Sequence, residues 1–358
     1  MNIATPSGQA SWPGVLDRYR SLLELPAQTA AVTLLEGNTP LVPMPRLAAE
    51  LGAEGIWVKY EGLNPTGSFK DRGMTVALSE AVHGGARAVI CASTGNTAAS
   101  AAAYAARAGV RCAVLIPEGK VAAGKLAGAI AYGARVAQIR GSFDEALALV
   151  VEVSKREPIA LVNSLNPFRL EGQKTAAFEI CDVLGSAPEL LALPVGNAGN
   201  ITAYWMGFCQ YDAAKGTGRP QLLGVQAEGA APLVLGHDVD RPETVATAIR
   251  IGRPARGAQA LAAARESGGR IVSVGDGEIL AAQRRLAAEG VWVEPASAAG
   301  VAGLRAEVDA GRLELRGRRV VCVCTGHGMK DPDVVTARFE GARTVPSSLD
   351  AIAELARG

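Results

Sequence analysis

A lysine in the segment 64–72 is the residue whose type and position could best support covalent chemistry. This segment has the sequence NPTGSFKDR, so Lys70 lies between a turn rich in Pro and Gly and an expected helix start. Backbone N–H groups and the positive end of a helix favour the neutral amine over the charged one. Schiff-base formation requires a neutral lysine amine. Most lysines at such junctions are solvated surface charges, so this segment alone does not establish a reaction.

Three further segments could bind the other groups of a phosphorylated aromatic cofactor. Residues 93–96 follow an expected strand and open an expected helix, where hydroxyl and amide donors could meet a carboxylate or a phenolate oxygen. The loop 196–200, GNAGN, has glycines that let the backbone fold around a phosphate with its N–H groups inward. Thr325 could offer a neutral hydroxyl to a pyridine nitrogen. Taken singly, each segment is equally a capped helix start or an ordinary turn.

The elements that must position these segments alternate along the chain from residue 86. Short β-branched runs precede amphipathic stretches, which predicts parallel strands joined by crossover helices. We expect strands at 86–91, 111–116, 134–139, 159–162, 190–194, 221–226, 291–293 and 319–324. We expect helices at 97–107, 121–132, 143–155, 172–184, 200–215, 276–288, 298–310 and 348–356. Because ligands bind beyond the carboxyl ends of parallel strands, the four segments should converge in one crevice.

The remaining regions have weaker patterns. Residues 229–269 are rich in Gly, Pro and Arg and should form short helices and loops, and the first sixty residues should form an arm and a hairpin. A domain change is expected near residues 163–166. We therefore expect a smaller α/β domain of residues 63–164 and a large domain of residues 1–62 with 165–358.

Composition limits the classes of partner. The chain has 358 residues and a formal net charge of +1, which gives no electrostatic reason to expect nucleic-acid or membrane binding. Its first residues lack the features of a signal peptide, and no apolar run is long enough to span a bilayer, so a cytoplasmic protein is expected. The six cysteines are scattered in apolar runs and share no ligand spacing with the three histidines. We expect no metal site.

The four segments, in this order and spacing, resemble those of the fold type II (tryptophan-synthase-β-like) pyridoxal-phosphate enzymes, and within that group the threonine synthases. The similarity covers roughly residues 34–333, and the full 196–200 loop with residues 325–331, TGHGMKD, favours this branch over dehydratases and cysteine synthases. The resemblance implies an α/β fold with two open, twisted, mostly parallel sheets and helices on both faces. It also implies pyridoxal 5'-phosphate in the crevice between two domains, and a homodimer.

The resemblance implies a role for each residue of a cofactor site. Lys70 would form the Schiff base with the cofactor and, once freed, act as the catalytic base. Asn96 would donate a hydrogen bond to the ring oxygen, and Thr325 would face the ring nitrogen. The cofactor phosphate would be held by Gly196, Asn197, Ala198, Gly199 and Asn200.

The implied substrate is O-phospho-L-homoserine, which would react with water by γ-elimination and β-addition to give L-threonine and phosphate, the last step of threonine biosynthesis. Its phosphate needs a second anion site. Asn163 and Ser164 follow an expected strand, and Arg169 could form a bidentate phosphate clamp. The alternative for Arg169 is an ordinary surface pair with Glu171 or another carboxylate.

Two points stay open at this stage. Ser93 and Thr94 would contact either the phosphate or the carboxylate of the substrate. The alternative function is a threonine or serine dehydratase or a cysteine-synthase-like lyase, which would share the cofactor chemistry without a second phosphate site. A non-catalytic cofactor-binding protein is a further alternative, against which the intact Lys70 weighs.

Overall fold

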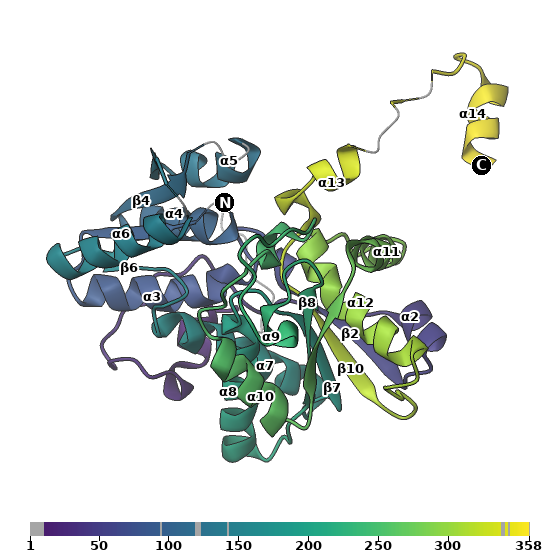
Figure 1. The fold of residues 1–358 in the computed structure, drawn as a ribbon, viewed down its shortest axis with the longest axis horizontal. Helices are drawn as coiled ribbons and strands as arrows, with labels where there is room; N and C mark the ends of the chain where they lie inside the picture. The colour runs from purple at the N-terminus through teal and green to yellow at the C-terminus, as the bar shows by residue number, and fades with distance from the viewer. Residues whose placement is uncertain are drawn as a thin grey trace, which may run out of the picture.

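Two separate sheets, each covered by helices on both faces, form the body of the protein (Figure 1). The computed structural model describes residues 11–93, 95–118, 123–141, 143–337, 341–342 and 344–357. The larger sheet has six strands in the order β1-β2-β10-β7-β8-β9, and the smaller has four in the order β5-β4-β3-β6. The predicted fold class, α/β with two mostly parallel sheets, is confirmed.

The six-stranded sheet is parallel except at one edge. Its strands are β1 (Leu41–Pro43), β2 (Gly55–Tyr60), β10 (Arg319–Cys324), β7 (Leu190–Pro194), β8 (Gln221–Ala227) and β9 (Arg270–Val274), and only β1 runs antiparallel to its neighbour. One face packs against α2 (Pro45–Leu51), α11 (Asp276–Ala287) and α12 (Pro295–Asp309). The other packs against α7 (Phe168–Leu184), α8 (Gly199–Lys215) and α10 (Gly257–Glu266). Burial on both faces explains why these strands are almost continuously apolar.

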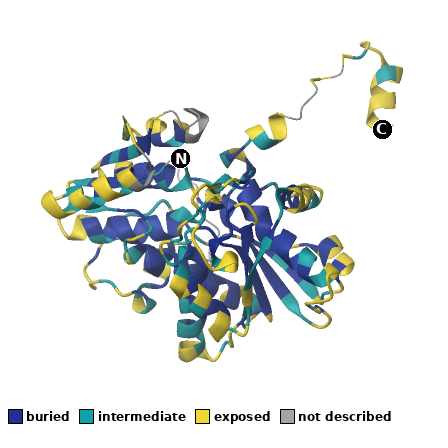
Figure 2. Ribbon diagram, in the orientation of Figure 1, coloured by how far each residue is buried: buried dark blue, intermediate teal, exposed yellow. Residues whose placement is uncertain are grey.

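The four-stranded sheet is wholly parallel. It consists of β5 (Arg135–Ile139), β4 (Arg111–Pro117), β3 (Ala88–Ala92) and β6 (Ala160–Leu161). One face is covered by α3 (Lys70–His83), α4 (Asn96–Ala108) and α5 (Ala123–Ala131), and the other by α6 (Phe143–Arg156). Buried residues concentrate in the inner strands of both sheets and in the helix faces against them (Figure 2).

Short elements complete the described chain. They are the helices α1 (Val15–Arg18), α9 (Pro232–Leu235), α13 (Asp333–Thr336) and α14 (Leu349–Arg357), and the 3-10 turns η1 (Arg20–Leu22), η2 (Glu61–Leu63), η3 (Thr247–Ile249) and η4 (Gly328–Lys330). None of the described helices has the length and apolar character needed to cross a membrane. The expectation of short helices and loops between residues 229 and 269 is confirmed by α9, η3 and α10.

Two sequence-based expectations need correction, and two strands were not predicted. The segment 291–293 forms no strand but only an isolated bridge from Val293 to His327, because Pro295 starts α12 two residues later. The expected N-terminal hairpin is instead an antiparallel pair, β1 and β2, with α2 between them. Strands β2 and β9 were not predicted, and in β2 the charged Lys59, which is fully buried, interrupts the apolar pattern.

Candidate active site

Lys70 is the first residue of α3, at the helix start that the sequence predicted. The turn before it is tied to the residues that follow β10. The Phe69 backbone N–H donates to the Thr325 carbonyl oxygen at 2.9 Å, and the His327 N–H donates to the Gly67 carbonyl oxygen at 3.0 Å. These bonds bring the lysine segment and the Thr325 segment together, although about 250 residues separate them in the sequence.

The environment of the Lys70 amine favours its neutral form. Burial, the largest effect, and the nearby positive charge of Arg169 lower the pKa of Lys70 to about 7, against the opposing charge of Glu294. Its Nζ lies 4.2 Å from the centroid of the Phe69 ring. Within the described part of the chain, no carboxylate forms an ion pair with Lys70. A substantial share of this amine is therefore uncharged near neutral pH, as nucleophilic or basic chemistry requires.

The loop 196–200 connects β7 to α8 and presents unused backbone donors. The N–H groups of its five residues have no acceptor within the described chain, as expected at a helix start. Ala198 takes the left-handed conformation, with φ of 64°, and a Cβ on Gly196 would lie only 3.0 Å from the Ile249 Cα. The Nδ2 of the buried Asn200 also has no hydrogen-bond partner in the part of the chain that the structure describes. Converging free donors at a helix N-terminus suit a phosphate.

Thr325 follows β10 and is buried, with 6% exposure. Its Oγ1 lies 2.9 Å from the Oγ of Ser297, which also accepts from the Gly326 N–H at 2.8 Å. Ser297 can supply the hydrogen to Thr325, which leaves the Thr325 hydroxyl hydrogen for an outside acceptor. Ser297 was not among the site residues predicted from the sequence. Its position in the first turn of a helix that begins with Pro295 is the signal that could have indicated it.

Asn96 opens α4 and contacts a carboxylate that was not predicted from the sequence either. Its Nδ2 donates to Glu294 Oε1 at 3.1 Å and to Oε2 at 3.3 Å. Ser93 lies just before this helix, and its Oγ accepts from the Gly95 N–H at 3.4 Å. Thr94, the other predicted substrate contact here, lies outside the described residues.

Arg169 is the second residue of α7 and is almost fully buried, with 1% exposure. Its Nη1 donates to the Val162 carbonyl oxygen at 2.9 Å, and its Nε has no hydrogen-bond partner among the residues that the structure describes. A Cβ on Gly73 would lie 2.7 Å from that Nε, so the guanidinium packs against the first turn of α3. Burial lowers the pKa of Arg169 to about 10, which still leaves it charged at neutral pH.

The alternative of a surface pair between Arg169 and Glu171 is excluded. The Glu171 carboxylate accepts instead from Lys174 Nζ at 2.5 Å and from the Glu24 N–H at 2.8 Å. No carboxylate of the described chain forms an ion pair with Arg169. A buried guanidinium without a counter-ion is a site that favours an anionic ligand.

Asn163 and Ser164, the other two predicted substrate residues, differ in the hydrogen bonds that they already form within the protein. The Asn163 amide accepts from the Ala92 N–H at 3.0 Å and donates to the Ala92 carbonyl oxygen at 2.8 Å. These two bonds give Asn163 a structural role at the end of β3. One of its two Nδ2 hydrogens remains available for a ligand. Ser164 is partly buried, and its carbonyl oxygen accepts from Arg256 Nε at 3.4 Å.

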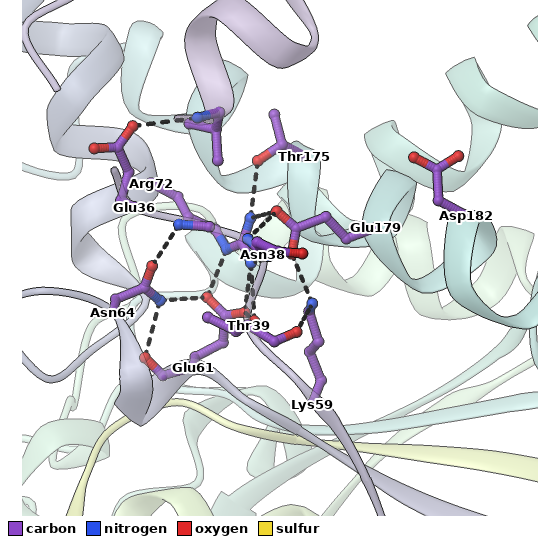
Figure 3. Close-up of polar contacts among 12 residues, drawn as sticks. Glu36, Asn38, Thr39, Lys59, Glu61, Asn64, Arg72, Thr175, Glu179 and Asp182 are labelled. Atoms are coloured by element: carbon purple, nitrogen blue, oxygen red, sulfur yellow. Dashed lines mark hydrogen bonds and ion pairs between the residues drawn. The ribbon is translucent and has the colours of Figure 1, made fainter. Parts of the chain in front are cut away.

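A second set of buried charges lies two residues further along α3 (Figure 3). Arg72 donates from Nε to Glu61 at 2.6 Å and from Nη1 and Nη2 to Glu179 at 2.7 Å. Lys59 Nζ lies 2.7 Å from the same Glu179 carboxylate. Burial alone would raise the pKa of Glu179, but the charges of Arg72 and Lys59 outweigh it and hold this pKa at about 2. This cluster joins β2, η2, α3 and α7.

The residues present fit pyridoxal phosphate. A largely neutral lysine suits its aldehyde, the orphaned donors of residues 196–200 suit its phosphate, and the Thr325 hydroxyl suits a neutral ring nitrogen. Arg169, which is buried and has no ion-pair partner in the described chain, adds a separate place for an anion.

Comparison with known proteins agrees with this chemistry. Residues 32–326 match the model of the family described as "Pyridoxal-phosphate dependent enzyme". The chain is 57% identical to a threonine synthase of Halalkalibacterium halodurans, over 92% of this chain and 93% of the relative. It is 54% identical to one of Mycobacterium tuberculosis, over 99% of each.

Solved structures show the same fold at lower identity. The processed form of threonine deaminase isoform 2 from Solanum lycopersicum has a TM-score of 0.72 at 23% identity and covers 93% of this chain and 95% of its own. Maize serine racemase has a TM-score of 0.73 at 19% identity, over 90% and 94% of the two chains. At these identities the two structures show the fold alone. The much higher identity to the threonine synthases extends over nearly the whole length and, together with the site, leads to one assignment. The chain belongs to the pyridoxal-phosphate-dependent enzymes and, within them, to the threonine synthases.

Proposed function

We propose that this chain converts O-phospho-L-homoserine and water into L-threonine and phosphate with the residues described above. The observation that carries the proposal is Arg169, a buried guanidinium with no counter-ion among the described residues, beside the first turn of α3. A substrate with its own phosphate needs such a second anion site, whereas dehydration of threonine or serine does not. The names of the relatives support the same substrate class.

The chain's residues divide the binding of pyridoxal phosphate among four elements. Residues 196–200 would bind its phosphate through backbone N–H groups, Asn96 would donate to its ring oxygen, and Thr325 would face its ring nitrogen. When bound, this cofactor supplies an aldehyde for amines and an electron sink for the carbanion at Cα. Lys70 is the residue to which the aldehyde would be attached.

Proton transfer falls to Lys70. Its Nζ, with a pKa of about 7, can take the Cα proton of the substrate and give a proton back at a later step. A base with a pKa near the working pH combines a useful deprotonated fraction with a strong enough affinity for the proton. Arg169 would hold the substrate phosphate, so that the bond from Cγ to the leaving oxygen keeps a fixed orientation.

The remaining polar residues would complete the substrate site. The free Nδ2 hydrogen of Asn163 and the Ser164 hydroxyl are close in sequence to Arg169 and would add donors to the phosphate. Ser93 and Thr94 precede α4 and would bind the substrate carboxylate or its phosphate.

A substrate comparison tests the proposal. The purified chain loaded with pyridoxal phosphate is expected to release phosphate from O-phospho-L-homoserine and form threonine in equal amounts. Formation of a keto acid from threonine, without phosphate release from phosphohomoserine, would instead support the dehydratase alternative.

We also propose a homodimer working in the cytoplasm, with two domains of residues 63–164 and of residues 1–62 with 165–358. The separate cores of the two sheets support this division, and the similarity to fold type II enzymes supports the dimer. Light scattering during gel filtration is expected to give twice the chain mass of 36.8 kDa.

A further inference from the structure

The Asn96 amide can face a ligand in two ways, because a half-turn about its last bond exchanges Oδ1 and Nδ2. The ring oxygen of pyridoxal phosphate is an acceptor that carries negative charge when it is deprotonated. An N–H facing this oxygen forms a charge-assisted hydrogen bond, whereas a carbonyl oxygen in the same place repels it. Some feature of the protein must therefore select the orientation.

Glu294 contacts this amide and is itself held firmly. Both carboxylate oxygens accept from Asn96 Nδ2, at 3.1 and 3.3 Å. The Glu294 N–H donates to the Gly326 carbonyl oxygen at 3.2 Å, and the Ser297 N–H donates to the Glu294 carbonyl oxygen at 3.0 Å. A Cβ on Gly326 would collide with Glu294 Oε1, so the absence of a side chain there leaves the space for this carboxylate.

Above the pKa of Glu294, its ionised carboxylate can only accept hydrogen bonds, so it attracts Nδ2 and repels Oδ1. We infer that Glu294 is a positioning residue that holds one N–H of Asn96, so that the second N–H of the same group points to the cofactor ring oxygen. This inference rests on the proposed role of Asn96, and it adds a residue that the predicted site lacked.

The surroundings of Glu294 argue against a purely structural role. It is 4% exposed, and no lysine or arginine among the described residues forms an ion pair with it. Burial raises the pKa of Glu294 to about 7, although the Asn96 bond and the charge of Lys330 act in the opposite direction. A buried, unpaired carboxylate destabilises the fold, so packing alone gives no reason for one here.

Binding of pyridoxal phosphate to the cofactor-free chain, measured well above the Glu294 pKa of about 7 so that this carboxylate is ionised, tests this inference without substrate or turnover. Glu294→Gln keeps the size of the side chain but offers Asn96 both a donor and an acceptor, so the orientation is no longer selected. We expect about tenfold weaker binding, the effect of one misdirected hydrogen bond to a charged group. The visible absorbance band of the bound cofactor should also shift.

A double-mutant cycle separates positioning from other effects. In an Asn96→Ala background, Glu294→Gln should change the dissociation constant by less than about twofold, because no amide remains to be oriented. An equal loss in both backgrounds, or no loss in the native background, would overturn the inference. Glu294→Asp, whose shorter side chain withdraws the carboxylate from Asn96, should weaken binding similarly and serves if the Gln variant does not fold.

Glu307→Gln is the matched control. Glu307 is a buried carboxylate on the same helix, α12, but it pairs with Arg270 and Arg312 and does not contact Asn96. This variant should bind pyridoxal phosphate as tightly as the native chain. Failure of the native chain to bind the cofactor would overturn the proposed function as well, whereas normal binding by Glu294→Gln would overturn only the role of Glu294.

Discussion

Lys70 and Arg72 lie two residues apart on α3, and each belongs to a different set of buried charges. The two sets differ in how completely their charges are paired. Arg72 forms hydrogen bonds with Glu61 and Glu179, and Glu179 also pairs with Lys59, so two positive and two negative groups neutralise each other (Figure 3). Lys70 and Arg169, in contrast, have no carboxylate partner in the described structure. The paired set joins elements of the fold, whereas the set without carboxylate partners among the described residues contains the two groups that we propose to bind an anion and to transfer protons.

The largest effect should follow from removing the unpaired lysine. Lys70→Ala is expected to lower turnover of O-phospho-L-homoserine at least about 10³-fold, because it deletes both the proposed attachment point of the cofactor and the proposed base. Thermal melting of the cofactor-free variant should be unchanged or higher, since a buried amine with a lowered pKa is removed. Near-normal phosphate release by this variant would refute the mechanism.

The paired set should respond in the opposite way. Arg72→Met leaves Glu61 and Glu179 with Lys59 as their only cation in the described cluster, so we expect the free energy of unfolding to fall by about 3–5 kcal/mol. Urea denaturation of the cofactor-free chain measures this loss. Arg156→Met is the control, because it breaks an exposed pair with Glu152 and should change stability by less than about 1 kcal/mol. Equal losses in the two variants would remove the distinction between the sets.

Arg169 gives a direct comparison with Arg72, because it is equally buried but has no ion-pair partner among the described residues. Arg169→Leu should raise KM for O-phospho-L-homoserine about 10- to 100-fold by removing charge-assisted contacts to phosphate. Its melting temperature should fall less than that of Arg72→Met, since no carboxylate is left without a partner. An unchanged KM in steady-state assays would show that the phosphate binds elsewhere.

The smallest expected effect is a pH dependence of stability. The pKa of Glu294 is raised from 4.5 to about 7 in the folded chain, so between these values the folded state binds more protons than the unfolded one. The stabilisation due to this proton is complete below about pH 4.5 and is lost as the pH rises through about 7. Glu294→Gln should remove about 1–3 kcal/mol of this change, as urea titrations of the cofactor-free chain at several pH values would show. An identical pH dependence in both proteins would contradict a buried, titrating carboxylate.

The local sequence was sufficient to predict most of the fold. Strands β7 and β10 have the predicted limits, residue for residue, and helices α4, α8 and α11 start and end within a residue of theirs. Periodicity and helix-start signals act over a few residues, so they are visible without tertiary structure. Strand β2 was missed because Lys59 interrupts its apolar pattern, and only the fold supplies Glu179 to pair with that charge.

The sequence by itself determined the chemistry that is available: a lysine at a helix start, and a glycine-rich loop and a threonine that each follow a strand. Tertiary structure decided which charges meet. Glu294 contacts Asn96 across 198 positions of the chain, Arg72 contacts Glu179 across 107, and Arg169 is buried with no carboxylate partner in the part of the chain that the structure describes. Burial and distance set the pKa of a group and its partners, and both arise only when segments remote in sequence pack together.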